Sequence, residues 1–277
     1  MNVFNQMETC VSTHFVYTAK ELDIMWKNKE NEAGPFDIIG DIHGCYVELC
    51  SLLNELGYIV DERGGIAIPT EDRKTVFLGD LCDRGPKNIE VLSLVMNMVL
   101  AGTAYCVTGN HDAKLSRSLR GYNVLLTHGL DKTIEQLRAQ KEEFIMEVNA
   151  FLEKLVCYYI FDKGRLVVAH AGLKEEYLGC DNKSVKSFCL YGDTTGEIDE
   201  YGLPIRKPWA KEYRGKALVV YGHTPTPEVE IINNTFCIDT GCVFGGRLTA
   251  LRYPEKEIIQ VNAKKKYYTP TKPFFDY

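Results

Sequence analysis

Acidic, amide and imidazole side chains follow short apolar runs at several separate places in this sequence, most of them beside glycine. The motifs are GDIHG at 40–44, GDLCDRG at 79–85, GNHD at 109–112, HAG at 170–172, GH at 222–223 and an aspartate at 239. Carboxylate, amide oxygen and imidazole together suit borderline divalent metals such as Mn, Fe, Ni or Zn. A structural zinc site would favour cysteine, and no cysteine pair has zinc-site spacing. Two cations that share one carboxylate can use this many ligands, so the pattern predicts a two-metal centre.

The repetition of this arrangement argues against chance. An isolated histidine after a strand is more often a core or surface residue than a ligand. Here four of the six histidines, together with two aspartates and one asparagine, stand at predicted strand ends. Side chains at the carboxyl ends of strands in an open α/β sheet converge on one crevice. We therefore expect these groups to meet at one site.

Short apolar runs predict the strands that would carry the motifs, at 36–40, 75–79, 104–108, 166–170, 217–221, 236–239 and 248–253. Hydrophobic periodicity predicts helices at 47–56, 88–100 and 132–156, and a short charged helix at 19–31. This alternation of short apolar runs with helical stretches is typical of an α/β fold.

The domain boundaries follow from changes in patterning. Residues 1–33 are weakly patterned and are expected to form an N-terminal extension, because Gly34-Pro35 marks a boundary. Residues 34–277 are expected to form one domain. Within it, residues 174–215 are rich in Gly, Asp, Lys and Tyr with little periodicity, which predicts a lid-like insertion over the site.

The composition limits the possible partners. The 277 residues are 45% hydrophobic and carry a net charge of −6. This balance argues against tracking along duplex nucleic acid, which needs many lysines and arginines, although recognition of a strand end needs few. Ten cysteines without a CxxC pair indicate reduced thiols in a cytoplasmic protein. There is no signal-peptide pattern and no membrane-length apolar stretch, so we expect no membrane association.

The order of the motifs resembles that of the calcineurin-like metallophosphoesterases, in the branch with serine/threonine phosphatases and symmetrical dinucleoside tetraphosphatases. A closer resemblance, over 34–41, 187–196 and 239–246, is to the phosphatase module of bacterial polynucleotide kinase-phosphatase RNA-repair proteins. The chain has no GxxxxGK[ST] or KxDG motif, so separate proteins would supply kinase and ligase activities. The resemblance implies an α/β fold: a sandwich of two mixed β-sheets flanked by helices, with a lid-like insertion.

The resemblance also implies which residues hold the metals. Asp80 would bridge the two cations. The other ligands would be Asp41 and His43 on one cation, and Asn110, His170 and His223 on the other. Two divalent ions are expected, with Mn favoured over Ni, Fe, Zn or Co.

The position of Pro225 departs from the family pattern, because many relatives have a second histidine there. Asp239 is expected to fill that role, either directly on a metal or through one of its ligands. The sequence does not choose between these two arrangements.

In the mechanism that the resemblance implies, a hydroxide held between the cations attacks phosphorus in line with the leaving oxygen. Arg84 is the candidate for stabilising charge on the phosphate oxygens, because its guanidinium matches two of them. His111 fits a general acid for the leaving alkoxide, and Asp83 would accept a hydrogen bond from its imidazole. The alternatives are a helix-capping role for Asp83 and a plain metal-ligand role for His111.

Other residues are candidates for substrate contacts. Arg206 could make a second phosphate contact. Lys264–Lys266 could contact a phosphate backbone, although a solvated cluster is the favoured interpretation. The aromatic side chains of the expected insertion could stack on a base or pack the insertion itself, namely Tyr191, Tyr201 and Trp209.

Three functions compete. The favoured hypothesis is a phosphomonoesterase that removes 2′- or 3′-terminal phosphates, and opens 2′,3′-cyclic phosphates, at RNA or DNA ends during nucleic-acid repair. The alternative is a symmetrical dinucleoside tetraphosphatase or a serine/threonine protein phosphatase, because one metal site serves several leaving groups. The third is a non-catalytic scaffold, which is disfavoured because Arg84, His111 and every expected ligand are present.

Overall fold

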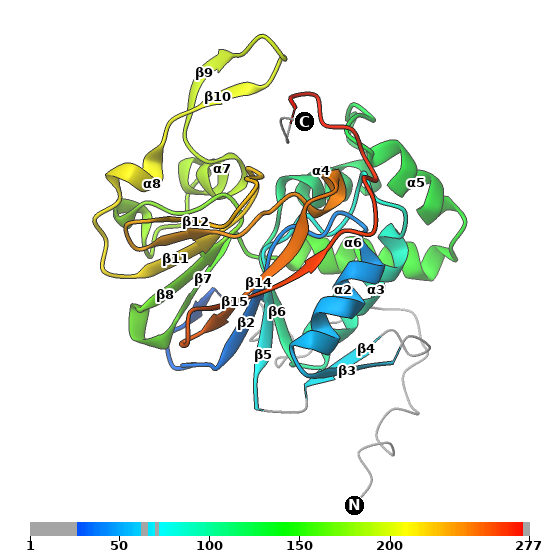
Figure 1. Ribbon diagram of the computed structural model, residues 1–277. Coiled ribbons are helices and arrows are strands. Elements are labelled where there is room, and N and C mark those ends of the chain that lie inside the picture. Colours follow the sequence, from blue (N-terminus) through cyan, green and yellow to red (C-terminus); the bar gives the residue numbers. More distant parts are fainter. Residues whose placement is uncertain (1–26, 62–65, 70–71, 274–277) are drawn as a thin grey trace, which may run out of the picture.

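The computed structural model describes residues 27–61, 66–69 and 72–273, which form two mixed β-sheets packed face to face (Figure 1). The first sheet has the order β15 (Glu257–Asn262), β14 (Arg247–Tyr253), β2 (Phe36–Ile39), β5 (Lys74–Phe77), β6 (Ala104–Cys106). The second has the order β1 (Asn28–Lys29), β7 (Tyr158–Phe161), β8 (Leu166–Ala169), β11 (Leu218–Tyr221), β13 (Thr235–Cys237), β12 (Glu230–Ile232). The predicted sandwich of two mixed sheets is confirmed.

Each sheet has three neighbouring parallel strands, and these strands carry the motifs. In the first sheet β2, β5 and β6 are parallel, and in the second β8, β11 and β13 are parallel. Their apolar side chains are buried on both faces, as near-continuous apolar runs predict. The core between the sheets includes Ile38 and Val76 from one sheet and Val168 and Val220 from the other.

Helices cover the two outer faces of the sandwich (Figure 1). The first sheet packs against α2 (Tyr46–Glu55), α3 (Asn88–Leu100), α5 (Leu130–Arg138) and α6 (Glu142–Lys154). The second packs against α7 (Lys183–Tyr191) and α8 (Trp209–Glu212). Helix α4 (Asn110–Leu119) begins just after β6, so its first residues lie at the end of the sheet. Single 3₁₀ turns occur at Asp162–Gly164, Glu175–Tyr177 and Cys242–Phe244.

The prediction of one long helix over 132–156 is wrong, because the chain forms two helices there, α5 and α6. The break lies at residues 139–141, where Lys141 has an extended backbone with ψ 149°. No fully buried residue lies between Leu137 and Val148, and residues 138–143 are all exposed, so no buried side chain holds the break itself against the core. The bend lets each helix direct its own apolar face inward.

Two other predicted segments differ from the structure. Of the charged helix expected at 19–31, residues 19–26 lie outside the described residues, and Asn28–Lys29 form β1, which pairs with β7. The segment 174–215 does contain strands. They form a hairpin, β9 (Thr194–Ile198) with β10 (Pro204–Arg206), which projects away from the sandwich (Figure 1).

Several short or edge strands gave no clear sequence signal. They run for two to six residues, and in an edge strand polar side chains alternate with apolar ones. Their positions are β1, β7, β12, β15 and a separate hairpin of β3 (Tyr58–Asp61) with β4 (Ile66–Pro69). All nine described cysteines are free thiols. Among the described helices, none has both the length and the hydrophobicity that crossing a membrane requires.

A buried ion pair lies at the end of the first sheet that is opposite the motifs. Arg73 Nε donates to Asp37 Oδ1 at 3.1 Å, and their side chains are 7% and 0% exposed. Asp37 also accepts from the Tyr58 hydroxyl at 3.0 Å. Burial raises the pKa of Asp37 against the opposing effect of Arg73.

Replacing Arg73 by methionine should lower the free energy of unfolding by about 3 kcal/mol, because it removes the closer of the two arginines that pair with the buried Asp37 carboxylate and leaves only Arg252, at 3.5 Å. Denaturant unfolding followed by circular dichroism measures this. Lys74→Met is the matched control, since Lys74 makes a partly exposed pair with Glu32 and should change stability by no more than about 1 kcal/mol. Equal effects of the two changes would contradict the prediction.

Candidate metal centre

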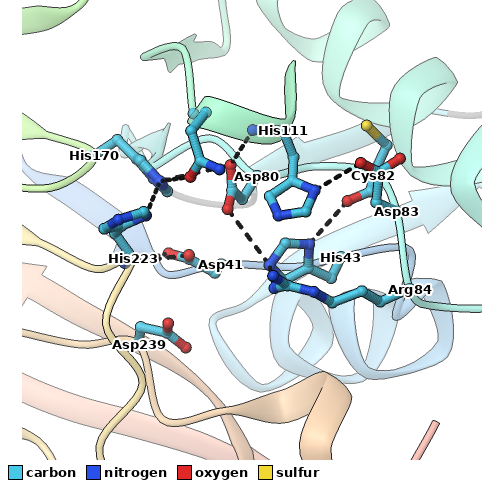
Figure 2. Close-up of polar contacts among 12 residues, drawn as sticks. Asp41, His43, Asp80, Cys82, Asp83, Arg84, His111, His170, His223 and Asp239 are labelled. Atoms are coloured by element: carbon cyan, nitrogen blue, oxygen red, sulfur yellow. Dashed lines mark hydrogen bonds and ion pairs between the residues drawn. The ribbon is translucent and has the colours of Figure 1, made fainter. Parts of the chain in front are cut away.

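The predicted ligands lie together at the carboxyl ends of the parallel strands, where the two sheets meet (Figure 2). Asp41 and His43 follow β2, and Asp80 follows β5. Asn110 begins α4 after β6. From the second sheet, β8, β11 and β13 lead to His170, His223 and Asp239 respectively. The topology therefore brings residues that are up to 198 positions apart into one cluster.

Asp80 occupies the centre of this cluster. Its Oδ2 lies 3.4 Å from Nε2 of His43, and its Oδ1 lies 3.5 Å from Nε2 of His170. Two groups of potential ligand atoms, each within 4.8 Å of one another, share Asp80: one with His43 and His111, the other with His170 and His223. This geometry fits a carboxylate shared between two cations.

Backbone carbonyls orient the imidazoles. His43 Nδ1 lies 2.8 Å from the carbonyl of Cys82, and His170 Nδ1 lies 2.9 Å from the carbonyl of Leu78. A carbonyl can only accept, so in both rings Nδ1 carries the proton and Nε2 keeps a lone pair. Burial lowers the pKa of His43 well below its usual value and that of His170 to about 4, so both rings are neutral near pH 7. Neutral imidazoles held in this way are suited to bind metal.

Lone-pair atoms face one another in the centre. His170 Nε2 lies 3.1 Å from Asn110 Oδ1 and 3.5 Å from Asp80 Oδ1. These atoms cannot hydrogen-bond to each other, whereas a cation can bind all three. His223 Nδ1 lies 3.0 Å from the same nitrogen of His170, and His223 Nε2 is buried without a hydrogen-bonding partner among the described residues. The donor set thus fits divalent metal ions.

Three buried carboxylates, those of Asp41, Asp80 and Asp239, lie in the same cluster. Burial raises the pKa of Asp80 and of Asp239 to about 7. Burial, and then repulsion from Asp239 and Asp80, raises the pKa of Asp41 well above its usual value. Carboxylates crowded in this way away from water require positive charge to remain ionised. Arg84 supplies one such charge, since its Nη1 lies 2.6 Å from His43 Nε2.

Asp239 and Asp41 both lie against Gly222, where an added Cβ would stand 3.3 Å from the Asp239 Cβ and 2.2 Å from Oδ1 of Asp41 (Figure 2). Oδ1 of Asp239 accepts a hydrogen bond from the backbone amide of Gly241 at 3.0 Å, which orients the carboxylate. Asp239 is therefore part of the cluster.

Asp83 contacts the imidazole of His111. Its Oδ2 lies 2.6 Å from His111 Nδ1, and its Oδ1 accepts from the Thr133 hydroxyl at 2.6 Å. The alternative in which Asp83 caps the next helix is wrong, because Lys87 holds the N-cap position of α3 and the Asn88 amide donates to Gln136 instead. Burial raises the pKa of Asp83 to about 6 and lowers that of His111.

Two supporting residues were missed from the sequence. Asp112 is fully buried, and its carboxylate accepts from the backbone amides of Asp80 at 2.7 Å, Leu81 at 3.0 Å and Gly109 at 2.9 Å. It therefore fixes the loop of Asp80 to the start of α4. The position of Asp112 in the GNHD motif could have identified it as part of the site. Thr133, which binds Asp83 from α5, gave no such signal because it is 50 positions away.

The backbone of the site is strained. Five of its non-glycine residues have a positive φ, which costs about 1–3 kcal/mol each where the surrounding structure enforces it. They are His43 (φ 45°), Asp80 (φ 47°), Asp83 (φ 73°), Arg84 (φ 67°) and His223 (φ 71°). Gly79 permits the close approach of two loops, since a Cβ there would lie 2.3 Å from the amide nitrogen of Gly109. Such strain is typical of functional sites.

Of the residues predicted to contact substrate, some lie near the metal ligands and one is buried in the core. Trp209 is 7% exposed and packs between α7 and the second sheet, so it cannot stack on a base. Tyr191 is 47% exposed, and its ring centre lies 6.5 Å from that of His223. Arg206 donates a hydrogen bond to the carbonyl of Tyr191. Tyr201 lies on the β9–β10 hairpin, with Lys272 Nζ 5.9 Å from its ring.

Comparison with known proteins adds to this geometry. Residues 34–259 match a family model described as calcineurin-like phosphoesterase. A Geobacillus protein (strain WCH70) named "Bis(5'-nucleosyl)-tetraphosphatase PrpE [asymmetrical]" is 49% identical over 235 residues, which cover 83% of this chain and 95% of that protein. The protein of the same name from Anoxybacillus flavithermus (strain DSM 21510 / WK1) is 47% identical, and the match covers 84% of this chain and 96% of that protein.

Solved structures agree on the fold. A crystal structure described as a "putative diadenosine tetraphosphatase" superposes with a TM-score of 0.61 at 26% identity, covering 85% of this chain and 96% of that one. A cold-active protein-tyrosine phosphatase from Shewanella has a TM-score of 0.59 at 14% identity, covering 89% of this chain and 85% of that one. At that identity the likeness concerns the fold alone.

These relatives overturn the prediction of a phosphatase for polynucleotide ends. Proteins that share nearly half of the residues are named as tetraphosphatases, which agrees with the alternative hypothesis and not with RNA repair. The segments behind the RNA-repair resemblance have structural roles. Residues 187–196 run from the second half of α7 into β9, and residues 239–246 carry Asp239 and the 3₁₀ turn that follows it. Such segments build the fold and the metal site, which do not specify the leaving group.

Proposed function

This chain belongs to the calcineurin-like phosphoesterase family, and from that premise we propose that it hydrolyses dinucleoside tetraphosphates asymmetrically, to a nucleoside monophosphate and a nucleoside triphosphate. The observation that carries the proposal is the 49% identity to a relative of that name, of which the match covers 95%. The cluster of candidate metal ligands supports a hydrolytic reaction at phosphorus. The alternative hypothesis from the sequence named the symmetrical form of this activity, whereas the relatives are named for the asymmetrical form.

We propose manganese as the resident metal, because carboxylate, amide and imidazole ligands without thiolate suit it. Asp80 would be shared, with Asp41 and His43 on one side and Asn110, His170 and His223 on the other. The two cations would supply the positive charge that activates water and neutralises phosphate oxygens.

The chain's own groups hold the phosphate and the proton. His43 Nε2 has one lone pair, so binding of a cation there excludes its contact with Arg84. Arg84 would then donate to phosphate oxygens, for which its planar guanidinium is suited. Asp83 holds the proton of His111 on Nδ1, which leaves Nε2 as the nitrogen that can exchange a proton with the substrate.

The test is product analysis with diadenosine tetraphosphate and manganese. We expect AMP and ATP in equal amounts by anion-exchange chromatography, and no turnover after removal of metal by EDTA. Two equivalents of ADP would contradict the asymmetrical cleavage. Faster turnover of a phosphoserine peptide than of diadenosine tetraphosphate would contradict the substrate class.

A further inference from the structure

A basic pocket adjoins the metal centre on the side of Arg84. It has a volume of about 460 Å³, and its lining includes Arg84, Lys132, Lys265, Lys266, Tyr267 and the carboxylate of Glu135. Arg84 belongs to both places, because its guanidinium also reaches His43 at 2.6 Å. The pocket therefore opens directly from the cluster, with four basic side chains against one acidic one.

Buried contacts fix the segment that carries two of these lysines. Glu48 is 1% exposed, and its Oε1 accepts from the Lys264 amide at 2.8 Å and from the Tyr267 hydroxyl at 2.8 Å. The amides of Tyr267 and Tyr268 donate to the carbonyl of Val243 at 3.0 and 3.1 Å. The lysines thus stand on backbone that is held against the core, which is unlike a solvated tail.

The opposite wall is also held in place. Gln136 on α5 accepts from the Asn88 amide at 2.9 Å and donates to the Pro86 carbonyl at 3.0 Å. These bonds tie α5, which carries Lys132, to the turn that follows Arg84. Both walls are therefore positioned before any ligand arrives, which favours binding.

The other side of the metal centre has a different charge balance. Figure 2 shows His223 and Arg84 on opposite sides of Asp80. On the His223 side, two residues after Tyr191, Asp193 pairs with Lys174 at 2.7 Å and with Lys207 at 3.7 Å. That side presents Tyr191 and one arginine, Arg206, which donates to the Tyr191 carbonyl, whereas the Arg84 side presents four basic side chains. A phosphate chain is attracted to the cationic side.

We propose that this pocket binds the triphosphate arm of the dinucleoside tetraphosphate, which sets the direction in which the substrate lies. The inference rests on the proposed function. The nucleoside monophosphate end then lies on the His223 side, with its phosphorus at the metal centre. This placement accounts for asymmetrical cleavage, since three phosphates lie on one side of the scissile bond and one on the other.

In the reaction, the oxygen of water forms a bond to the phosphorus of the monophosphate end. The bond from that phosphorus to the bridging oxygen breaks, and the bridging oxygen leaves on the triphosphate with the electron pair. A proton from water passes to solvent. The lysines stabilise the negative charge that collects on the departing triphosphate.

The experiment compares manganese-loaded wild type with the double variant K265A/K266A and with Lys264→Ala. Lys264 is the matched control, because it neighbours the pair but does not line the pocket. For K265A/K266A we expect kcat/KM on diadenosine tetraphosphate to fall at least about tenfold, and inhibition by ATP to weaken by a similar factor. The salt dependence of kcat/KM should also become shallower, which loss of structure would not cause. Lys132→Ala tests the other wall and should act in the same direction.

The outcomes separate the pocket from the proposed function. If wild type hydrolyses diadenosine tetraphosphate and K265A/K266A matches it, or if Lys264→Ala loses as much, the pocket is rejected and the function stands. If wild type shows no such activity, the function fails. Binding of inorganic tripolyphosphate to the manganese-loaded protein then decides the pocket, and equal binding by wild type and K265A/K266A overturns it.

Discussion

Replacing Asp80 by asparagine is expected to lower kcat at least about a thousandfold, because the change removes the carboxylate at the centre of the cluster. Both of its oxygens face histidine Nε2 atoms, at 3.4 and 3.5 Å. Asparagine has nearly the same volume but only one neutral oxygen, so it cannot be shared between two cations. The measurements are turnover of diadenosine tetraphosphate and the manganese content per chain, which should fall below two.

Asp181→Asn is the control for this change. Asp181 is 55% exposed and pairs with Lys27 and Lys186 on the surface, so activity and metal content should stay at the wild-type level. Circular dichroism checks that both variants are folded. A folded D80N protein that keeps two manganese ions would show that Asp80 is not a shared ligand.

His111→Ala is expected to have effects that depend on the leaving group. Hydrolysis of an alkyl phosphate such as glycerol phosphate should slow by about 10²- to 10⁴-fold, because a leaving alkoxide must be protonated. Hydrolysis of p-nitrophenyl phosphate and of diadenosine tetraphosphate should slow by less than about tenfold, because their leaving groups are weak bases. Asp83→Asn should show the same ranking, since Asp83 holds the proton of His111 at 2.6 Å.

The competing role for His111 predicts a different pattern. Its ring contributes a nitrogen to the group that contains His43 and Asp80, all within 4.8 Å. If His111 is simply a metal ligand, all three substrates should lose activity equally and the manganese content should fall. Steady-state kinetics on the three substrates, together with metal analysis, distinguish the two roles.

Much of the fold could be predicted because burial on both faces leaves a plain sequence pattern. Each parallel strand is a short apolar run, and each ends where a polar motif begins, as at Asp41 after β2 and His170 after β8. The bend between α5 and α6 could not be predicted in this way. Leu137 and Phe144 keep helical spacing across it, and only the missing burial between Leu137 and Val148 distinguishes two helices from one.

The sequence by itself determined the chemistry of this protein, because the side chains that can bind metal and phosphate stand directly after the strands that place them. Tertiary structure decided what surrounds that chemistry. It brought Thr133 to Asp83 from 50 residues away and set Lys265 and Lys266 beside Arg84. The hydrophobic pattern of a single segment does not predict such contacts. They depend on how segments that are distant in the sequence pack against one another. For the same reason, the motifs identified a phosphoesterase, whereas its substrate depends on the walls around the metals.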